Sequence, residues 1–351
     1  MNILNQPTAE QMDTQNAILA GIASQLGGIT IESWADVQRI TRMGLASKCF
    51  TVGDQLVATY DGEEKVWDVI GIDHDTPADT NFSHSLTVQS RDVLRYNCQF
   101  SAPQAMYNAV TALPAGTYIF TTNGIQYQVT TTVEIPEGGV LYISSRNEYV
   151  PLELTSYQAD RITEIETGLV VTATTGTDNL TPINDYVRMR YGSNRYIDSA
   201  FRQWLNSEDA IFAWEPQGLY DMPSSYETEG FINLLDPELV AVIGAVDKQV
   251  AKASIDGGGQ DTYTEKIFPL SRVEMGLGDE GITTGESVYS FWENATEEDR
   301  IKLQGTPARY WWLRLPYVGS SSSVRTVNTS GALNGSGASY GYGAAPACVI
   351  V

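Results

Sequence analysis

RYWWLRLPYVGSSSSVRTVNTSGALNGSGASYGYGAAPACVIV, residues 309–351, stands apart from the rest of the chain in composition and charge. An aromatic start (Tyr310–Leu313) and an apolar end (Cys348–Val351) enclose residues that are nearly all small or tyrosine. From Tyr317 to Ala345, 24 of 29 residues are Gly, Ser, Ala, Asn, Thr or Tyr. Antibody loops use these residues, because tyrosine gives rigid contact area while Ser, Gly and Asn give adaptable hydrogen bonds. We therefore expect a presented binding surface.

A flexible Gly/Ser linker is the alternative interpretation of this stretch. A linker joins two folded parts, whereas only the short segment APACVIV follows here. Four apolar residues also interrupt the small residues, as inward-pointing side chains of short strands would: Val318, Val324, Val327 and Leu333. The pattern favours a structured surface over a floppy tail.

The charge of the chain is strongly and unevenly distributed. The net charge is −22, yet residues 301–351 contain no Asp or Glu. They carry four cations instead: Lys302, Arg309, Arg314 and Arg325. Because like charges repel phosphate, we expect no general binding to nucleic acid or to an anionic membrane surface. The cations either face a partner or pair with carboxylates of the body.

Size and composition predict a globular protein. The 351 residues, 42% of them apolar, suffice for one large domain or two to three smaller ones. No 18-residue apolar run and no secretory signal are present, so we expect no membrane span. The three cysteines are odd in number and far apart, as in a protein made in a reducing cytosol.

Three helices are predicted. Residues 8–27 have Thr8 as a possible N-cap and end at Gly27, and their apolar residues recur at heptad-like spacing: Met12, Leu19, Ile22 and Leu26. This segment either docks or oligomerises, or lies on the body. A second helix is expected at 32–43, and a third within 184–207, with Ile197, Phe201 and Trp204–Leu205 on one face.

Strand-like patterns fall in two groups. The first group comprises 49–52, 55–59 and 66–72, with the hairpin turn Asp61–Gly62 between the last two. The second group lies between Gly, Pro and Asn turns, as in an all-β insertion: 117–121, 127–133, 140–143 and 168–174.

Four motifs carry a resemblance to a known group of proteins: WDVIGID (67–73), RYGSNRYIDSAFRQWLNS (190–207), FPLSRVEMG (268–276) and the ending RYWWLRLPY…VNTSGAL…APACVIV. The chain resembles, over about residues 30–351, phage and prophage proteins whose C-terminal domain has a C-type-lectin-like fold, distantly related to formylglycine-generating enzymes. The resemblance is most specific from WWLR to APAC.

The resemblance implies an α+β chain with a C-type-lectin-like fold, an inserted β-rich lobe and a short N-terminal helix. The expected division is a docking or oligomerisation segment (1–30), a first part of the lectin-like domain (31–112), the β-rich insertion (113–180) and a second part (181–351). The second part includes a variable region, residues 315–345, called the C-terminal segment below.

Proteins with this ending resemble target proteins of diversity-generating retroelements, in which adenine-directed mutagenesis rewrites chosen codons, typically of the asparagine type. The resemblance implies these ligand-binding residues: Tyr317, Ser320, Ser322, Ser323, Thr326, Gly335, Ser336, Gly337, Ser339, Tyr340 and Tyr342. It implies this scaffold between them: Val324, Arg325, Val327, Asn328, Ser330, Gly331, Ala332 and Leu333. Leu315 departs from the small polar residue expected there, so its place in the varied set is open.

We expect a phage receptor-binding, adhesin-like protein of the virion. Its expected partners are a bacterial cell-surface protein or glycan, other virion proteins and further copies of itself in a homotrimer. The alternative is a virion structural or decoration protein whose lectin-like domain mediates assembly. An enzyme is not expected, because a formylglycine-generating site needs a cooperating cysteine pair and no hydrolase or phosphate-binding motif occurs.

Two groups of residues raise the question of a metal. His74 and His84 lie near three aspartates (Asp73, Asp75, Asp79), but their spacing fits no ligand pattern, and a polar loop capping a strand is the alternative. WEPQ at 214–217 and WEN at 292–294 faintly echo the calcium motifs of sugar-binding lectins. We expect neither a metal nor a cofactor.

Overall fold

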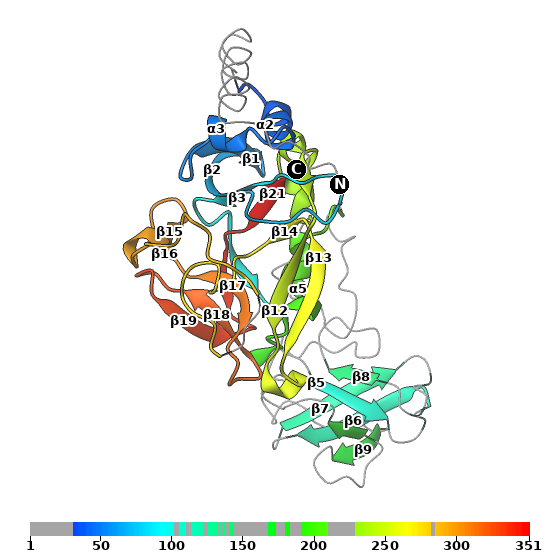
Figure 1. The fold of residues 1–351 in the computed structure, drawn as a ribbon. Helices are drawn as coiled ribbons and strands as arrows, with labels where there is room; N and C mark the ends of the chain where they lie inside the picture. Colours follow the sequence, from blue (N-terminus) through cyan, green and yellow to red (C-terminus); the bar gives the residue numbers. More distant parts are fainter. Residues whose placement is uncertain are drawn as a thin grey trace, which may run out of the picture.

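The protein has a mixed α+β fold made mostly of β-sheet, with few helices (Figure 1). A computed structural model describes residues 31–101, 191–209, 229–281 and 285–351, together with short stretches, chiefly strands, between 105 and 182. The predicted helix 8–27 lies outside the described residues. Among those described, no helix is long and apolar enough to cross a membrane.

A six-stranded sheet joins the two ends of the described chain. Its strands are β1 (Gln55–Tyr60), β2 (Glu63–Ile72), β3 (Leu86–Ser90), β21 (Ala347–Ile350) and β11 (Ile243–Gly244), in that order, with β14 (Ile267–Phe268) also paired with β21. The predicted β1–β2 hairpin is confirmed. Its turn residues Asp61 and Gly62 both have positive φ, 51° and 75°, as a type I′ turn requires.

A five-stranded sheet contains the C-terminal segment. Its order is β19 (Leu333–Gly337), β18 (Ser323–Val327), β17 (Trp311–Pro316), β20 (Gly341–Ala344) and β4 (Arg95–Gln99). All six residues of the central strand β17 are buried. Trp311 and Trp312 belong to two different core clusters, because successive side chains of a strand point to opposite faces.

Two hairpins and the helices complete the body. Their bounds are β12 (Val246–Ala251) with β13 (Gln260–Glu265), β15 (Lys302–Leu303) with β16 (Ala308–Arg309), α2 (Trp34–Arg42), α3 (Ala46–Cys49), α5 (Ala200–Leu205) and α6 (Pro237–Val240). Helix α2 begins at the N-cap Ser33, whose hydroxyl accepts from the Asp36 N–H, and it buries Trp34, Val37 and Ile40.

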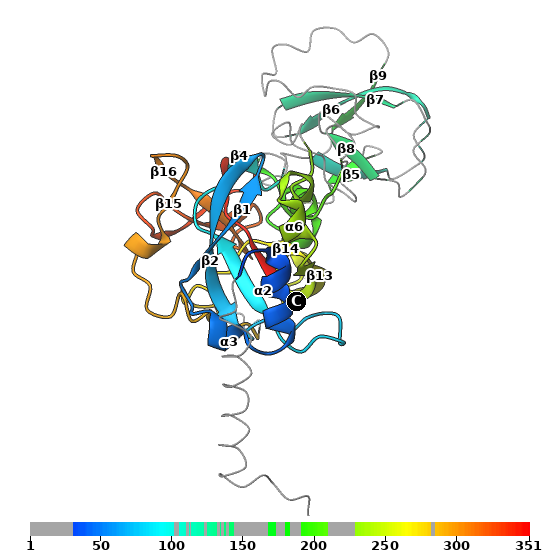
Figure 2. The ribbon, with the colours of Figure 1, turned by 90° about the horizontal axis from the view of Figure 1, so that it is seen from above.

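Strands β5–β10 form two further three-stranded sheets. They are β5 (Ala105–Ala109), β6 (Gly116–Thr122), β7 (Ile125–Thr131), β8 (Val140–Ile143), β9 (Gly168–Thr172) and β10 (Leu180–Pro182). Their orders are β10-β5-β8 and β7-β6-β9, and none of these described strands pairs with the body sheets. Figure 2 shows them to one side of the body. Strand β5 precedes residue 113, so the paired strands begin before the expected insertion.

Some of the helices and strands predicted from the sequence are confirmed, and others are wrong. The helix at 32–43 and the strands at 55–59 and 66–72 are confirmed as α2, β1 and β2. The strand expected at 49–52 is wrong, because α3 extends to Cys49, the Phe50 N–H closes on the Ala46 carbonyl, and a turn at Gly53 (φ 101°) follows. Within the described residues 191–207, the third predicted helix is present as the short helix α5, preceded by a 3-10 turn at Tyr196–Asp198.

Candidate functional site

The C-terminal segment forms two surface loops on a fixed strand frame. The first loop (residues 317–322) joins β17 to β18, and the second loop (residues 338–340) joins β19 to β20. Between them, β18 and β19 pair without a gap from Ser323–Gly337 to Val327–Leu333. Both loops therefore lie at the same end of this pair, at the Ser323–Gly337 register.

Two exposed tyrosines flank a floor of glycine on one face of β19. Gly335 and Gly337 point to the same face, because they are two residues apart in a strand. A Cβ at Gly335 would lie 4.0 Å from the Tyr317 Cβ, and a Cβ at Gly337 would lie 3.5 Å from the Tyr340 ring. Tyr317 is 44% exposed and Tyr340 is 52% exposed. This arrangement, with the half-buried Ser323, is called the tyrosine surface below.

The opposite face of the same strands points into the core. Thr326 is fully buried, and Ser322 and Ser336 are nearly so. The sequence-based expectation is that eight residues project from one exposed face: Tyr317, Ser320, Ser322, Thr326, Ser336, Ser339, Tyr340 and Tyr342. It is wrong for Ser322, Thr326 and Ser336, which are buried. Alternation explains Thr326 and Ser336, since each is one residue away from an outward-facing position. The Thr326 hydroxyl lies in the core, and it has no hydrogen-bond partner among the described residues.

Tyr342 is a packing residue as much as a surface residue. Its ring lies 4.9 Å from Tyr310, in a stacked arrangement, and 4.9 Å from Trp312. Its hydroxyl and the Ser336 hydroxyl lie 3.2 Å apart. Truncation of Tyr342 would thus remove contacts with the core, unlike truncation of Tyr340. Ser320 and Ser339, in the two loops, are half-buried.

Three residues beside the tyrosine surface were not among the expected ligand-binding residues. The Arg325 guanidinium lies 4.1 Å from the centre of the Tyr317 ring. Glu280, whose side chain is 12% exposed, forms ion pairs with both Arg325 and Arg272. Tyr191 has its Cβ 3.4 Å from the position of a Cβ at Gly337. Tyr191 and Glu280 are far in sequence from the C-terminal segment. The motif at 190–207, which contains Tyr191, was the only sequence signal that could have indicated a role for either residue.

A buried network of charges lies under β17. The Arg314 guanidinium, fully buried, pairs with Glu274 and Glu286, while Lys248 Nζ lies 2.9 Å from Glu274 and 2.5 Å from Asp75. Burial opposes ionisation of Glu274, but the Arg314 and Lys248 charges outweigh it and lower its pKa to about 2. Arg314 and Arg325 thus pair with carboxylates of the body, which was one of the two expected alternatives for the cations.

The two histidines have protein partners. His74 stacks on Tyr289 at 3.9 Å, and burial lowers its pKa. His84 Nδ1 lies 3.2 Å from Asp73. Asp75 is engaged by Lys248, Thr87 and Tyr289. In the part of the chain that the structure describes, no group of three or more His, Cys, Asp or Glu residues could hold a metal. WEPQ (214–217) lies outside that part, and Trp292 is in the core.

The three cysteines are all free. Cys98 in β4 and Cys348 in β21 are fully buried. Burial raises the pKa of Cys98 to about 12 and the pKa of Cys348 well above its usual range. Neither thiol is poised for nucleophilic chemistry, because the thiolate is the reactive form.

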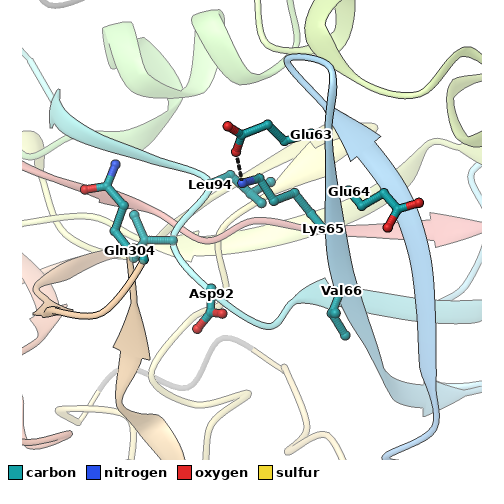
Figure 3. A pocket seen from close by; sticks show the side chains of 9 residues that line it. Glu63, Glu64, Lys65, Val66, Asp92, Leu94 and Gln304 are labelled. Carbon is teal, nitrogen blue, oxygen red and sulfur yellow. Dashed lines mark hydrogen bonds and ion pairs between the residues drawn. The ribbon is translucent and has the colours of Figure 1, made fainter.

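A separate hollow of about 380 Å³ lies between β2, residues 92–94 and the β15–β16 turn. Figure 3 shows the charged side chains that line it, Glu63, Glu64, Lys65 and Asp92. Lys65 Nζ lies 2.6 Å from Glu63, so these two charges largely neutralise each other. None of the expected ligand-binding residues lines this hollow.

Comparison with known proteins gave one match. Residues 173–351 match the model of a family described as a domain of unknown function (DUF6273). The match takes in half of the chain, including β17–β21 and both surface loops. No curated protein and no solved structure matched the chain.

Proposed function

We propose that this chain, which belongs to the DUF6273 family, is a phage receptor-binding, adhesin-like protein that displays a diversified surface of C-type-lectin-like fold. The proposed ligand is a protein or glycan on the bacterial cell surface, and the proposed location is the virion. The observation that carries the proposal is the tyrosine surface. Two exposed loop tyrosines lie beside glycine and serine of strands whose other face points into the core.

The frame of this surface suits a site that accepts many side chains. Gly335 and Gly337 would each meet a new Cβ at ordinary contact distance, 3.4 Å or more, and Gly319 would meet nothing within 4 Å. By contrast, a Cβ at Gly331 or Gly341 would collide with Glu297 or Asn97. Thus the two glycines assigned to the varied set have room for a Cβ, whereas Gly331, assigned to the scaffold, does not.

Ligand binding fits the chemistry of this surface better than catalysis does. Tyrosine dominates interface hot spots because it buries large area at low entropic cost. Two of the three thiols, Cys98 and Cys348, are buried, and burial raises the pKa of both, which disfavours the reactive thiolate. We therefore propose that the chain is not an enzyme.

Binding of fluorescently labelled protein to a panel of bacterial cells tests this proposal. Replacing Tyr317 and Tyr340 together by Ser should weaken cell binding more than tenfold, because each buried interface tyrosine contributes about 2 kcal/mol or more. The melting temperature should change little, since both rings are about half exposed. Met43→Ser, at an apolar side chain that is 62% exposed at the end of α2, is the matched control.

Three other outcomes would each remove a part of the proposal. Unchanged binding by the double variant would show that the tyrosine surface is not the site. A chain that binds no cells but assembles into particles would favour the structural or decoration role. If no near-copy of the 309–351 coding segment, differing only at adenines, lies beside a reverse-transcriptase gene, the surface is not diversified.

A further inference from the structure

Both surface loops are held by side chains from outside the C-terminal segment, and these side chains bind main-chain atoms of the loops. We propose that Asn194, Glu280 and Gln99 are positioning residues: they fix the loop main chain so that loop side chains can be exchanged without loss of the loop conformation. The purpose of these bonds rests on the proposed function, but the bonds themselves and the experiment that tests them do not require a ligand.

The first loop is held on two sides. The side-chain amide of Asn194, which is fully buried, donates to the Ser320 carbonyl at 2.7 Å and to the Ser323 carbonyl at 3.0 Å. From the other side, the Glu280 carboxylate accepts the Val318 N–H at 3.1 Å while it pairs with Arg325. A buried amide that donates twice to one loop fixes where that loop turns.

The second loop is held in the same manner. The Gln99 amide in β4 donates to the Ser339 carbonyl at 2.6 Å. The Ser339 N–H donates in turn to the Tyr191 carbonyl at 2.8 Å. The two loops are also joined to each other, because the Ala338 N–H donates to the Ser322 carbonyl at 2.8 Å.

Bonds to the main chain persist whatever side chain the loop residue carries, because every residue except proline has the same N–H and C=O groups. Two bonds of the first loop do depend on a side chain: the Ser320 hydroxyl accepts the Ser322 N–H at 3.3 Å and the Ser323 N–H at 3.0 Å. When Ser320 changes, the Asn194 and Glu280 bonds remain, because both reach main-chain atoms of the loop.

The turn between β18 and β19 provides a contrast within the same segment. There Asn328 holds the turn with its own side chain, which accepts from the Ser330 N–H at 2.9 Å and the Ala332 N–H at 3.0 Å. This turn depends on its own sequence, and all three residues were assigned to the scaffold. The loops held from outside are the loops that carry the exposed tyrosines.

Hydrogen exchange of the full chain, followed by mass spectrometry, tests the inference without any ligand. Asn194→Ala should raise the exchange of the Tyr317 and Ser320 amides about tenfold, because two hydrogen bonds of the loop are lost. Gln99→Ala should do so at 338–340 only. Asn328→Ala, the matched control, should act at 328–332 and leave both loops unchanged. Exchange in β21 should not change in any variant.

A second measurement asks whether the loop then depends on its sequence. Ser320→Tyr and Ser320→Asp should leave first-loop exchange within about twofold of wild type, but should raise it further in the Asn194→Ala background. Glu280→Gln keeps an acceptor oxygen for the Val318 N–H, so its effect on first-loop exchange should be smaller than that of Glu280→Ala.

The inference is overturned if Asn194→Ala leaves exchange at 317–323 unchanged, or if exchange rises equally in β21, which would indicate global destabilisation. It is also overturned if Ser320→Tyr alone frees the loop. Cell binding by the tyrosine variants tests the proposed function only. Whatever its result, the hydrogen-exchange measurements test the positioning residues separately.

Discussion

Individual glycines of the C-terminal segment differ in whether another residue could replace them. Gly331 has φ of +83°, a conformation that other residues rarely adopt, and its missing Cβ leaves room for the Glu297 carbonyl. Gly335 does not have a positive φ, and a Cβ there would meet its neighbours at ordinary contact distances. The two glycines lie four residues apart, in the turn and in the strand of the same hairpin.

We expect Gly331→Ala to lower the free energy of unfolding by about 3 kcal/mol or more, from backbone strain and collision together. Gly335→Ala should change it by less than about 1 kcal/mol. Urea unfolding of both variants measures the difference. Equal losses would mean that the spacing of the two strands, rather than the individual residue, decides tolerance.

Glu265 gives the protein a measurable dependence on pH. Burial raises its pKa to about 7, because the Arg202 and Arg314 charges only partly offset the loss of solvation. Between its unfolded pKa, about 4.3, and about 7, the folded state therefore binds more protons than the unfolded state. Stability contributed by the protonated form is present below this window and is lost as pH rises through it.

We expect wild type to lose stability relative to Glu265→Gln between pH 5 and 7, by at most about 1.4 kcal/mol per pH unit. Above about pH 8 the difference should be constant. Thermal unfolding of both proteins from pH 5 to 8.5 measures it. The lowered pKa of His74 makes stability rise with pH in both proteins, so its contribution cancels in the comparison. A constant difference over the whole range would show that Glu265 is ionised throughout.

At the scale of helices, strands and turns, the sequence predicted an element reliably where a single local conformational preference decides its structure. The Asp61–Gly62 turn was predictable because few residues other than Gly, Asn and Asp accept positive φ at both turn positions. The run at 49–52 was misread, because β-prone residues alone do not make a strand without a partner, and none pairs with it. Strands β3 and β4 were not predicted, although β3 is the middle strand of one sheet and β4 forms the edge of the other.

The tyrosine surface was predictable only in part, because its geometry depends on strand pairing. Composition located the segment and its tyrosines, but not which positions face inward. That depends on the register of β18 and β19, which buries Thr326 and Ser336 and exposes Tyr317 through the loop geometry. Asn194, Gln99 and Glu280 could not be found from the segment itself, since their bonds to the loop main chain span 38 to 240 residues of sequence.

For the whole molecule, the remaining question is how many copies present the surface together. Residues 8–27 place Met12, Leu19, Ile22 and Leu26 at heptad-like spacing, and an isolated helix of this length is marginal in water. We expect this segment to associate with its copies, most simply in a homotrimer. Three linked surfaces would bind a repetitive cell surface with higher avidity than one, without any new contact.

Sedimentation of the full chain at micromolar concentration should therefore give a trimer, and a variant with Leu19 and Ile22 replaced by Ser should give a monomer. The control is Val57→Ser, which removes an apolar side chain, 53% exposed, from β1 and should leave the trimer intact. The monomeric variant should keep its melting temperature, because these residues precede the described core, but should bind cells far more weakly. A full chain that sediments as a monomer would exclude this role of residues 8–27. A trimer that survives the Leu19 and Ile22 change would place the interface elsewhere.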